Sequence, residues 1–237
     1  MNIKTIIRQY VKMAAQNIYL PAVYGLYKKR GRKGPHGLIL LADAHHDECP
    51  ESMKYLADYL KKNSNGVKIE EMYLDYGKAS FLQTLKHMTR FMKRYAAARA
   101  VVISDNFLPV AGCKKRKDTK VLQLWHACGA MKRFGYDTDD DIPAWYRGTV
   151  FRNIDAVTVS SPKCVPCFAS AMRLKEENIR PVGVSRTDCY FDPEWNSKMK
   201  ERFDSEVPSH KGKKVVVWAP TFRGNPGDPR SINLDIE

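Results

Sequence analysis

The sequence predicts an α/β protein built on a Rossmann-like parallel sheet. Short apolar runs recur along the chain after residue 37, and segments with the apolar spacing of helices separate them. Strands that alternate with helices of this length are typical of βαβ units, in which helices cover both faces of a parallel sheet. The chain has 237 residues, 43% of them hydrophobic, which is enough to bury such a core.

The predicted elements follow one another in a regular order. The predicted strands span residues 38–42, 67–74, 100–104, 121–124, 156–160 and 179–184. Between the first two strands, a helix is expected because Met53, Leu56, Ala57 and Leu60 share one helical face. Further helices are expected over residues 81–95 and 162–174, and the charged segment 114–120 is expected to be an exposed loop. We assign residues 35–190 to this Rossmann-like domain.

Residues 191–237 are expected to form a linker and the start of a second domain. A helical pattern and a Lys-rich loop occupy residues 191–212, and a fresh buried strand is predicted over Val215 to Ala219. The tail that follows is rich in Pro and Gly. Because one strand cannot form a domain, this strand either extends the first sheet or opens a unit of which the chain holds only a fragment.

Residues 1–34 are strongly basic and amphipathic. The formal net charge is +14, and Asp43 is the first acidic residue, so that eight basic residues precede any acidic one. Ile3, Ile6, Ile7, Tyr10, Val11, Ala14 and Ile18 follow the spacing of one helical face. This pattern favours a helix lying on an anionic membrane surface, with the basic cluster after Tyr27 adding attraction. The alternative is an ordinary helix packed on its own domain.

The sequence disfavours both a membrane-spanning protein and a nucleic-acid-binding protein. No apolar run reaches the roughly 18 to 20 residues needed to span a bilayer. A nucleic-acid-binding protein would carry its positive charge along the folded domain with aromatic stacking platforms, whereas here the excess is concentrated in the amphipathic N-terminal segment. We therefore expect a peripheral membrane protein and no nucleic-acid partner.

His126 is the strongest candidate for chemistry. It follows the predicted strand 121–124 and would emerge at the carboxyl edge of the sheet, where open α/β sheets bind ligands. Gly129 and Ala130 would allow a substrate to approach the start of a following helix, whose free N–H groups suit a phosphate, and Lys132 and Arg133 add positive charge. The alternative is a histidine that only packs at the end of a strand.

Weaker signals lie elsewhere. His45, His46, Asp47 and Glu48 follow the first strand at the same predicted edge, where His45 and His46 could form an acceptor-binding loop. Adjacent loop residues rarely converge on one metal ion, so we predict no metal site. Cys164 and Cys167 have the CxxC spacing, but no second pair completes a zinc site, and six scattered cysteines fit free thiols in a reducing cytosol.

Three segments together resemble the CDP-glycerol glycerophosphotransferases, which prime and polymerise teichoic acids and related polymers. The segment VLQLWHACGAMKRFG, residues 121–135, resembles that family's strand with Trp, His, Gly and Lys. The segment VGVSRTD, residues 182–188, is similar to its Gly-x-Pro-Arg-x-Asp segment, with Ser185 in place of proline. The segment VVVWAPTFRGN, residues 215–225, resembles its Ala-Pro-Thr-Phe-Arg strand.

The resemblance implies the N-terminal, acceptor-binding half of a two-domain GT-B fold and the opening of a CDP-glycerol-binding half. It implies transfer of glycerol phosphate from CDP-glycerol to a lipid-linked acceptor at the cytoplasmic face of the membrane, without a cofactor. His126 would be the general base. The implied substrate-binding residues are Gly129, Lys132, Gly183, Arg186, Asp188, Thr221 and Arg223. The family's later motifs have no counterpart in this chain, and the rival prediction is a GT-B glycosyltransferase that uses a nucleotide sugar.

Overall fold

The chain folds into two compact units, Met1–Cys189 and Tyr190–Glu237, in a computed structural model. The structure describes residues 3–30, 37–64, 66–139, 141–219, 223–225 and 228–230, without the side chains of residues 3–5, 8, 30, 223–225 and 228–230.

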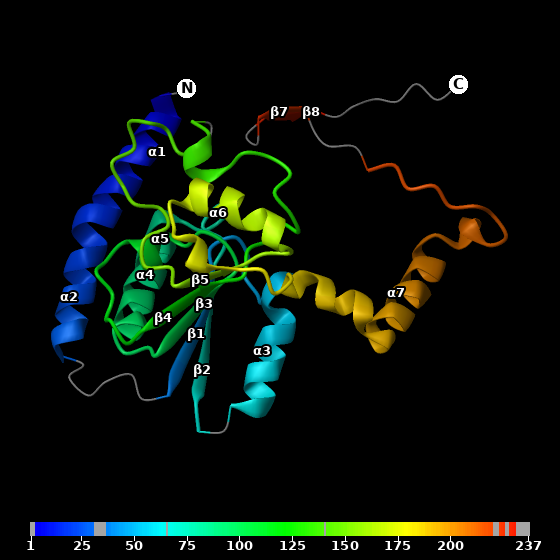
Figure 1. Ribbon diagram of the computed structural model, residues 1–237, viewed down its shortest axis with the longest axis horizontal. Helices are drawn as coiled ribbons and strands as arrows, with labels where there is room; N and C mark the ends of the chain where they lie inside the picture. The colour runs from blue at the N-terminus through cyan, green and yellow to red at the C-terminus, as the bar shows by residue number, and fades with distance from the viewer. Residues whose placement is uncertain are drawn as a thin grey trace. The chain divides into compact units, whose positions relative to one another are not determined.

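A parallel sheet forms the centre of the first unit (Figure 1). Its strands are β1 (Leu38–Asp43), β2 (Lys68–Tyr73), β3 (Ala100–Ile103), β4 (Lys120–Gln123), β5 (Ala156–Thr158) and β6 (Ile179–Arg180). They lie side by side in the order β2-β1-β3-β4-β5-β6, and every neighbouring pair is parallel. All carboxyl ends therefore meet at one edge, and β1, β3 and β4, which precede the predicted site residues, are direct neighbours there.

Helices cover both faces of this sheet. Figure 1 shows α3 (Glu51–Asn63) beside one face, with α2 (Leu20–Arg30) and α4 (Phe81–Tyr95) beside the other. The face under α4 also receives α5 (Leu108–Ala111) and α6 (Val165–Met172). Single 3-10 turns span Gly135–Asp137, Pro162–Cys164, Glu176–Asn178 and Ser185–Phe191. The two-sided cover explains why the inner strands β1 and β3 are nearly continuous apolar runs.

Successive side chains of each strand enter opposite layers of the core. On β1, Leu40 and Ala42 pack into the larger layer with Phe91 and Tyr95, whereas Leu41 packs with Met53 under α3. This alternation fixes the register of the sheet, because a slip of one residue would exchange the two layers.

The predicted helix over residues 81–95 agrees with α4 to the residue. Ser80 caps it, since its hydroxyl accepts a hydrogen bond from the Gln83 N–H while the Gln83 side chain accepts one from the Ser80 N–H. The predicted strand 179–184 is wrong beyond Arg180, where β6 ends, and Gly183, whose φ is 98°, then turns the chain. The helix expected over residues 162–174 begins as a 3-10 turn and ends at Met172, after which Arg173 adopts the left-handed conformation.

The N-terminal segment is helical and runs through three sections. These are α1 (Ile3–Ala14), a π-helical turn η1 (Ala15–Tyr19) and α2. One side packs on the domain: Leu20 and Tyr24 are fully buried, and Gln16 donates a hydrogen bond to the Thr149 carbonyl at 2.5 Å. None of the described helices is both long and apolar enough to span a bilayer.

The second unit contains α7 (Pro193–Glu206), a 3-10 turn at Pro208–His210 and an antiparallel pair, β7 (Arg223–Asn225) and β8 (Asp228–Arg230). Asp192 caps α7 through its carboxylate. The predicted buried strand over Val215 to Ala219 is wrong. No strand forms there, and the Val216 and Val217 side chains are 88% and 81% exposed. Among the described residues, no neighbouring strand supplies the backbone hydrogen bonds that a strand requires.

Candidate active site

His126 lies directly beyond the carboxyl end of β4, as the sequence predicts. The residue before it, Trp125, has a positive φ of 63°, a left-handed conformation that costs a bulky side chain on the order of 1 to 3 kcal/mol. Its buried indole packs against Phe134 and Phe168 and stacks on the His126 ring, with centroids 4.7 Å apart. This packing holds the turn and leaves the His126 side chain 51% exposed.

Asp105 is the partner of His126. It follows β3, the neighbouring strand, and its Oδ2 lies 2.9 Å from Nδ1 of His126. The hydrogen bond to Asp105 raises the pKa of His126, against the opposing effect of partial burial. Burial would raise the pKa of Asp105, but the hydrogen bond and charge of His126 outweigh it and lower that pKa. The pair leaves Nε2 of His126 as the ring nitrogen that can meet a ligand.

Arg186 reaches the same turn from the loop after β6. Its Nη1 donates a hydrogen bond to the backbone carbonyl of His126 at 3.2 Å, and the side chain is otherwise exposed. Gly183 provides the left-handed bend that brings this loop back, and a Cβ there would meet no atom within 4 Å. Asp188 lies on the same loop and is exposed. The structure thus brings His126 and Arg186 together across strands β4 to β6.

The helix expected directly after Gly129 is wrong. Residues 127–134 form an irregular loop, and the first helical turn after it is the 3-10 turn at Gly135. Gly135 has a φ of 60°, and its Cα faces the Ala171 carbonyl so closely that a Cβ would collide with it. This contact ties the loop to α6, so that tertiary packing replaces the predicted helix.

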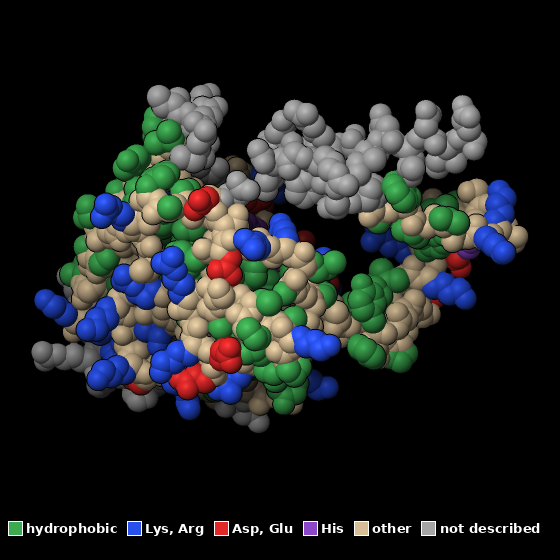
Figure 2. Space-filling model, turned by 45° about the horizontal axis from the view of Figure 1, so that its top comes forward, with side chains coloured by type: hydrophobic (Ala, Val, Ile, Leu, Met, Phe, Trp, Pro, Cys, Tyr) green, Lys and Arg blue, Asp and Glu red, His purple; other side chains and the backbone are tan. Residues whose placement is uncertain are grey.

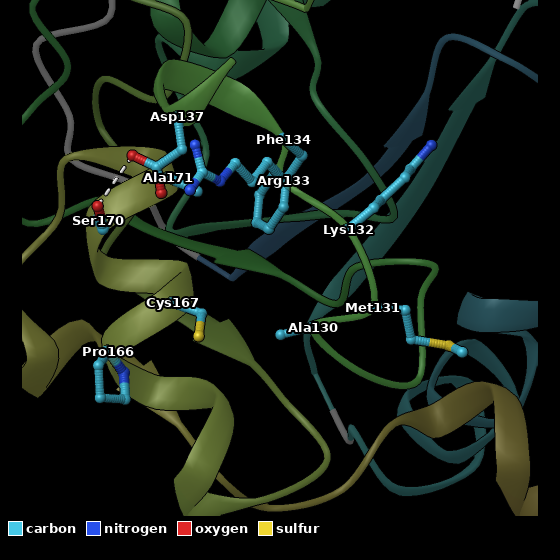
Figure 3. A pocket seen from close by; sticks show the side chains of 10 residues that line it. All are labelled: Ala130, Met131, Lys132, Arg133, Phe134, Asp137, Pro166, Cys167, Ser170 and Ala171. Carbon is cyan, nitrogen blue, oxygen red and sulfur yellow. Dashed lines mark hydrogen bonds between the residues drawn. The ribbon is translucent and has the colours of Figure 1, made fainter.

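Before this contact, a pocket of about 540 Å³ lies between the loop and α6 (Figure 3). The loop contributes residues 130–134, and α6 contributes Pro166, Cys167, Ser170 and Ala171. Figure 3 shows the Lys132 side chain extending away from α6, and both Lys132 and Arg133 are exposed. His126 does not line this pocket. Gly129 lies between His126 and the pocket-lining residues in the sequence, and a Cβ there would meet only the Met131 side chain at 3.9 Å.

The end of β1 carries a second carboxylate and imidazole pair. Asp43 is buried, and its Oδ1 lies 2.8 Å from Nδ1 of His46 and accepts a hydrogen bond from the backbone N–H of His45 at 2.7 Å. Its other oxygen accepts a hydrogen bond from the buried Ser104 hydroxyl at the end of β3. His45 and His46 are therefore at the predicted edge of the sheet, and both rings are exposed.

Two predicted substrate-binding residues, Thr221 and Arg223, belong to the second unit. Thr221 lies outside the described residues, and Arg223 begins β7 but its side chain is not described. The six cysteines are free thiols. Hydrogen bonds from Ser160 and Ser161 and from the backbone of Ala130 lower the pKa of Cys164, which is buried. No cluster of three or more metal-binding side chains occurs in the described part of the chain.

Asp105, Ser104 and Asp43 are site residues that sequence reasoning missed. A usable signal was present, because each directly ends or follows a buried apolar strand, in LILLAD and AVVISD. Polar side chains at the carboxyl ends of adjacent parallel strands converge at one edge. Which carboxylate pairs with which histidine depends on the strand order, which only the fold reveals.

Residues 29–237 match the family model described as CDP-Glycerol:Poly(glycerophosphate) glycerophosphotransferase. The chain is 30% identical over 216 residues to a teichoic acid ribitol-phosphate primase of Bacillus spizizenii, covering 84% of this chain and 54% of the relative. It is 34% identical over 219 residues to the ribitol-phosphate polymerase TarK of Staphylococcus aureus, with 89% and 41% covered. A glycerol-phosphate primase of Bacillus subtilis is 32% identical over 131 residues, with 52% and 32% covered. The chain thus spans about half or less of the length of these relatives.

Solved structures agree on the fold. A histidine-to-asparagine variant of the wall teichoic acid polymerase TagF superposes with a TM-score of 0.59 at 13% identity, covering 87% of this chain and 53% of that one. Another TagF variant gives a TM-score of 0.57 at 14% identity, with 88% and 54% covered. At such identities the likeness concerns the fold alone. Together with the parallel sheet, it confirms the predicted fold class of a Rossmann-like N-terminal half of a GT-B-like protein.

Proposed function

The chain belongs to the CDP-glycerol:poly(glycerophosphate) glycerophosphotransferase family, and from this premise we propose that it forms the acceptor half of a transferase that builds teichoic-acid-type polymers. The transferase would move glycerol phosphate from CDP-glycerol to a hydroxyl of a lipid-linked acceptor and release CMP. The observation that carries the proposal is the Asp105–His126 pair at the carboxyl edge of the sheet. TagF, whose fold this chain shares, has been solved after a soak with CDPG, which supports the choice of donor.

His126 would act as the general base. Its Nε2 takes the proton of the acceptor hydroxyl while the hydroxyl oxygen attacks the β-phosphorus of CDP-glycerol. The bond from that phosphorus to the CMP oxygen breaks, and CMP leaves with the bonding electrons. The carboxylate of Asp105 holds the proton on Nδ1, so that Nε2 is free to accept one. A base placed in this way contributes roughly 10² to 10⁴ in rate.

Cationic side chains would stabilise the charge on the transferred phosphate and on CMP. Arg186 is the strongest candidate, because its hydrogen bond to the His126 carbonyl places a guanidinium beside the base. Lys132 is exposed on the loop after His126 and has room to turn toward a ligand. Thr221, Arg223, Gly129, Gly183 and Asp188 remain proposed substrate-binding residues on the strength of the family motifs.

Ribitol phosphate is the second candidate for the transferred group. Two relatives, at 30% and 34% identity, are named for ribitol phosphate, whereas the glycerol-phosphate primase aligns over a shorter stretch. The chemistry at His126 is the same for both donors, because each presents a diphosphate with CMP as the leaving group. The polyol is therefore selected by groups outside the Asp105–His126 pair.

The test is CMP release by the longest available form of the protein, supplied with a lipid-linked acceptor analogue and either CDP-glycerol or CDP-ribitol. We expect His126→Ala to lower turnover at least about 10²-fold with the fold intact. His210→Ala is the matched control, because this histidine pairs with Asp204 in the helical part of the second unit. Release of UDP or GDP from a nucleotide sugar would favour the rival glycosyltransferase. Unchanged turnover in His126→Ala would refute the assignment of the base.

We further propose that the N-terminal helices attach the protein to the cytoplasmic face of the membrane. Along α1 and η1 the side chains of Ile7, Tyr10, Val11 and Ile18 are each at least half exposed, and they share the helical face that the sequence pattern defines. Trp145 joins this face from a distant loop, since its ring stacks on Tyr10 at 5.6 Å. Figure 2 shows hydrophobic side chains over α1 with Lys and Arg side chains beside them. An apolar strip with Tyr and Trp next to basic side chains suits the headgroup region of an anionic bilayer.

Vesicle flotation tests this attachment. We expect the chain to float with vesicles of phosphatidylglycerol and phosphatidylcholine, and Val11→Asp to lose most of that binding. Tyr59→Asp is the matched control, because Tyr59 is 64% exposed, against 50% for Val11, but lies on α3, beside the opposite face of the sheet. If both variants float like the parent chain, or if competitor DNA removes the parent from the vesicles, the membrane proposal is wrong.

A further inference from the structure

The carboxyl edge of the sheet carries two imidazoles held in the same way. His126 pairs through Nδ1 with Asp105 at 2.9 Å, and His46 pairs through Nδ1 with Asp43 at 2.8 Å. Both rings are about half exposed, with 51% and 54% of each side chain open to solvent. In both pairs Nε2 is the nitrogen left for a ligand. The proposed mechanism uses only one of them.

The second pair is built into the core edge. Asp43 is 2% exposed, and among the described residues His46 is the only ionisable group paired with it. The backbone N–H of His45 and the hydroxyl of Ser104 also donate to this carboxylate. A buried carboxylate with three donors holds a partner ring firmly, because moving the ring would leave a buried charge short of a hydrogen bond. The orientation of His46 is therefore fixed before any ligand arrives.

The two pairs are connected through β3. Ser104, which donates to Asp43, is followed directly by Asp105, which holds His126. His45 also contributes, after burial and the contacts of His126 and Asn106, to the low pKa of Asp105, so His45 lies within electrostatic range of the carboxylate that holds the proposed base. Strands β1 and β4 lie about 10 Å apart with β3 between them. Two hydrogen bonds of about 2.8 Å and a small polyol between them can bridge such a span.

We propose that His46 is a second acceptor-binding residue, whose Nε2 accepts a hydrogen bond from the non-reacting hydroxyl of the terminal polyol while His126 acts on the reacting hydroxyl. This inference rests on the proposed function. The ligand class is a terminal diol, which glycerol phosphate and ribitol phosphate share. Asp43 and Ser104 are then positioning residues, because they act through the ring of His46. The arrangement orients the acceptor by two points, which fixes the hydroxyl that attacks.

The test compares two acceptors. One ends in glycerol phosphate, and the other ends in 1,3-propanediol phosphate, which lacks the non-reacting hydroxyl. For the parent protein in its longest form, we expect KM for the acceptor that ends in glycerol phosphate to be about 3- to 10-fold lower than KM for the other acceptor. This is the range of one hydrogen bond. His46→Ala should remove this discrimination with little change in kcat, and His46→Gln should restore part of it through its amide oxygen. Glu48→Gln, in the same loop, should keep the parent's discrimination.

Equilibrium binding separates this inference from the proposed function. Glycerophosphoglycerol and its propanediol counterpart can be titrated into the protein by calorimetry without any donor, so the measurement does not depend on turnover. If His46→Ala discriminates between the two probes as well as the parent does, or if the parent does not discriminate, the inference is wrong. If the parent protein releases no CMP in the turnover assay but still discriminates between the two probes in calorimetry, the proposed transfer reaction is wrong and the diol site stands.

Discussion

Two short segments of this chain are almost wholly apolar, yet only one of them becomes a strand. Leu38 to Ala42 lies in β1, between β2 and β3, where Leu40, Leu41 and Ala42 are fully buried. Val215 to Trp218 is richer in β-branched residues, yet it forms no strand and its side chains are at least half exposed. β1 has a parallel neighbour on each side and helices over both faces. The difference shows that strand propensity becomes structure only where neighbours supply hydrogen bonds and cover.

The largest expected effect tests this difference in stability. Leu41→Ala would remove a fully buried side chain from the layer beneath α3 and should lower the free energy of unfolding by about 2 to 5 kcal/mol. Val217→Ala, at a side chain that is 81% exposed, should change it by less than about 0.5 kcal/mol. Urea denaturation followed by circular dichroism measures both. A cost for Val217→Ala that approaches that of Leu41→Ala would show that the second segment is buried in solution.

A smaller effect sharpens the comparison within the first unit, at the loop that follows His126. Gly135→Ala would place a residue with a side chain at a φ of 60° and push its Cβ into the Ala171 carbonyl. We expect a loss of at least about 2 kcal/mol, because both backbone strain and a backbone collision are involved. The same denaturation experiment measures this loss.

Gly66→Ala separates the two causes. Gly66 has a φ of 76°, and a Cβ there would meet no atom within 4 Å, so only the strain of the left-handed conformation remains. This strain costs about 1 to 2 kcal/mol. Equal losses for the two variants would mean that the loop of residues 127–134 is not tied to α6 through Gly135.

The same contrast explains what the sequence could predict. The helix over residues 81–95 was predicted to the residue because its pattern is local, and the capping box that the structure shows at Ser80 and Gln83 is local as well. The histidine at the end of β4 was found because strand ends are visible as the ends of apolar runs. The predicted helix after Gly129 is wrong because packing of Gly135 on α6 outweighed local preference. The predicted strand at Val215 is wrong because no neighbouring strand pairs with it among the residues that the structure describes.

Of the two Asp–His pairs at the candidate site, one is set by local sequence and the other by the tertiary fold. Asp43 and His46 are three residues apart, so their contact is local and could have been proposed from sequence. Asp105 and His126 meet only because β3 and β4 are neighbours in the sheet, and Arg186 reaches His126 only because Gly183 turns the chain back. Contacts between such distant residues depend on the order of the strands in the sheet, which no single segment of the sequence encodes.

The smallest expected effect concerns the charge of His126. Asp105 raises the pKa of this imidazole above its usual value of 6.5, and Asp105→Asn should therefore lower it. A group whose pKa is raised by folding stabilises the fold below the unfolded pKa, and this contribution is lost as the pH rises through the folded pKa. The pair should thus stabilise the parent chain most below about pH 6.5 and less above the raised pKa. NMR titration of the His126 Cε1–H resonance reports the shift directly and requires no substrate.

The pH dependence of turnover tests the same pair in the reaction itself. A general base works only when deprotonated, so kcat/KM of the longest form should rise with pH through the raised pKa of His126. In Asp105→Asn the rise should move to lower pH, while the plateau should fall because the proton is no longer held on Nδ1 by a carboxylate. His46→Ala should leave the position of this rise in place, since Asp43, and not Asp105, is its partner. A rise that stays fixed in Asp105→Asn would show that some group other than His126 limits the rate at low pH.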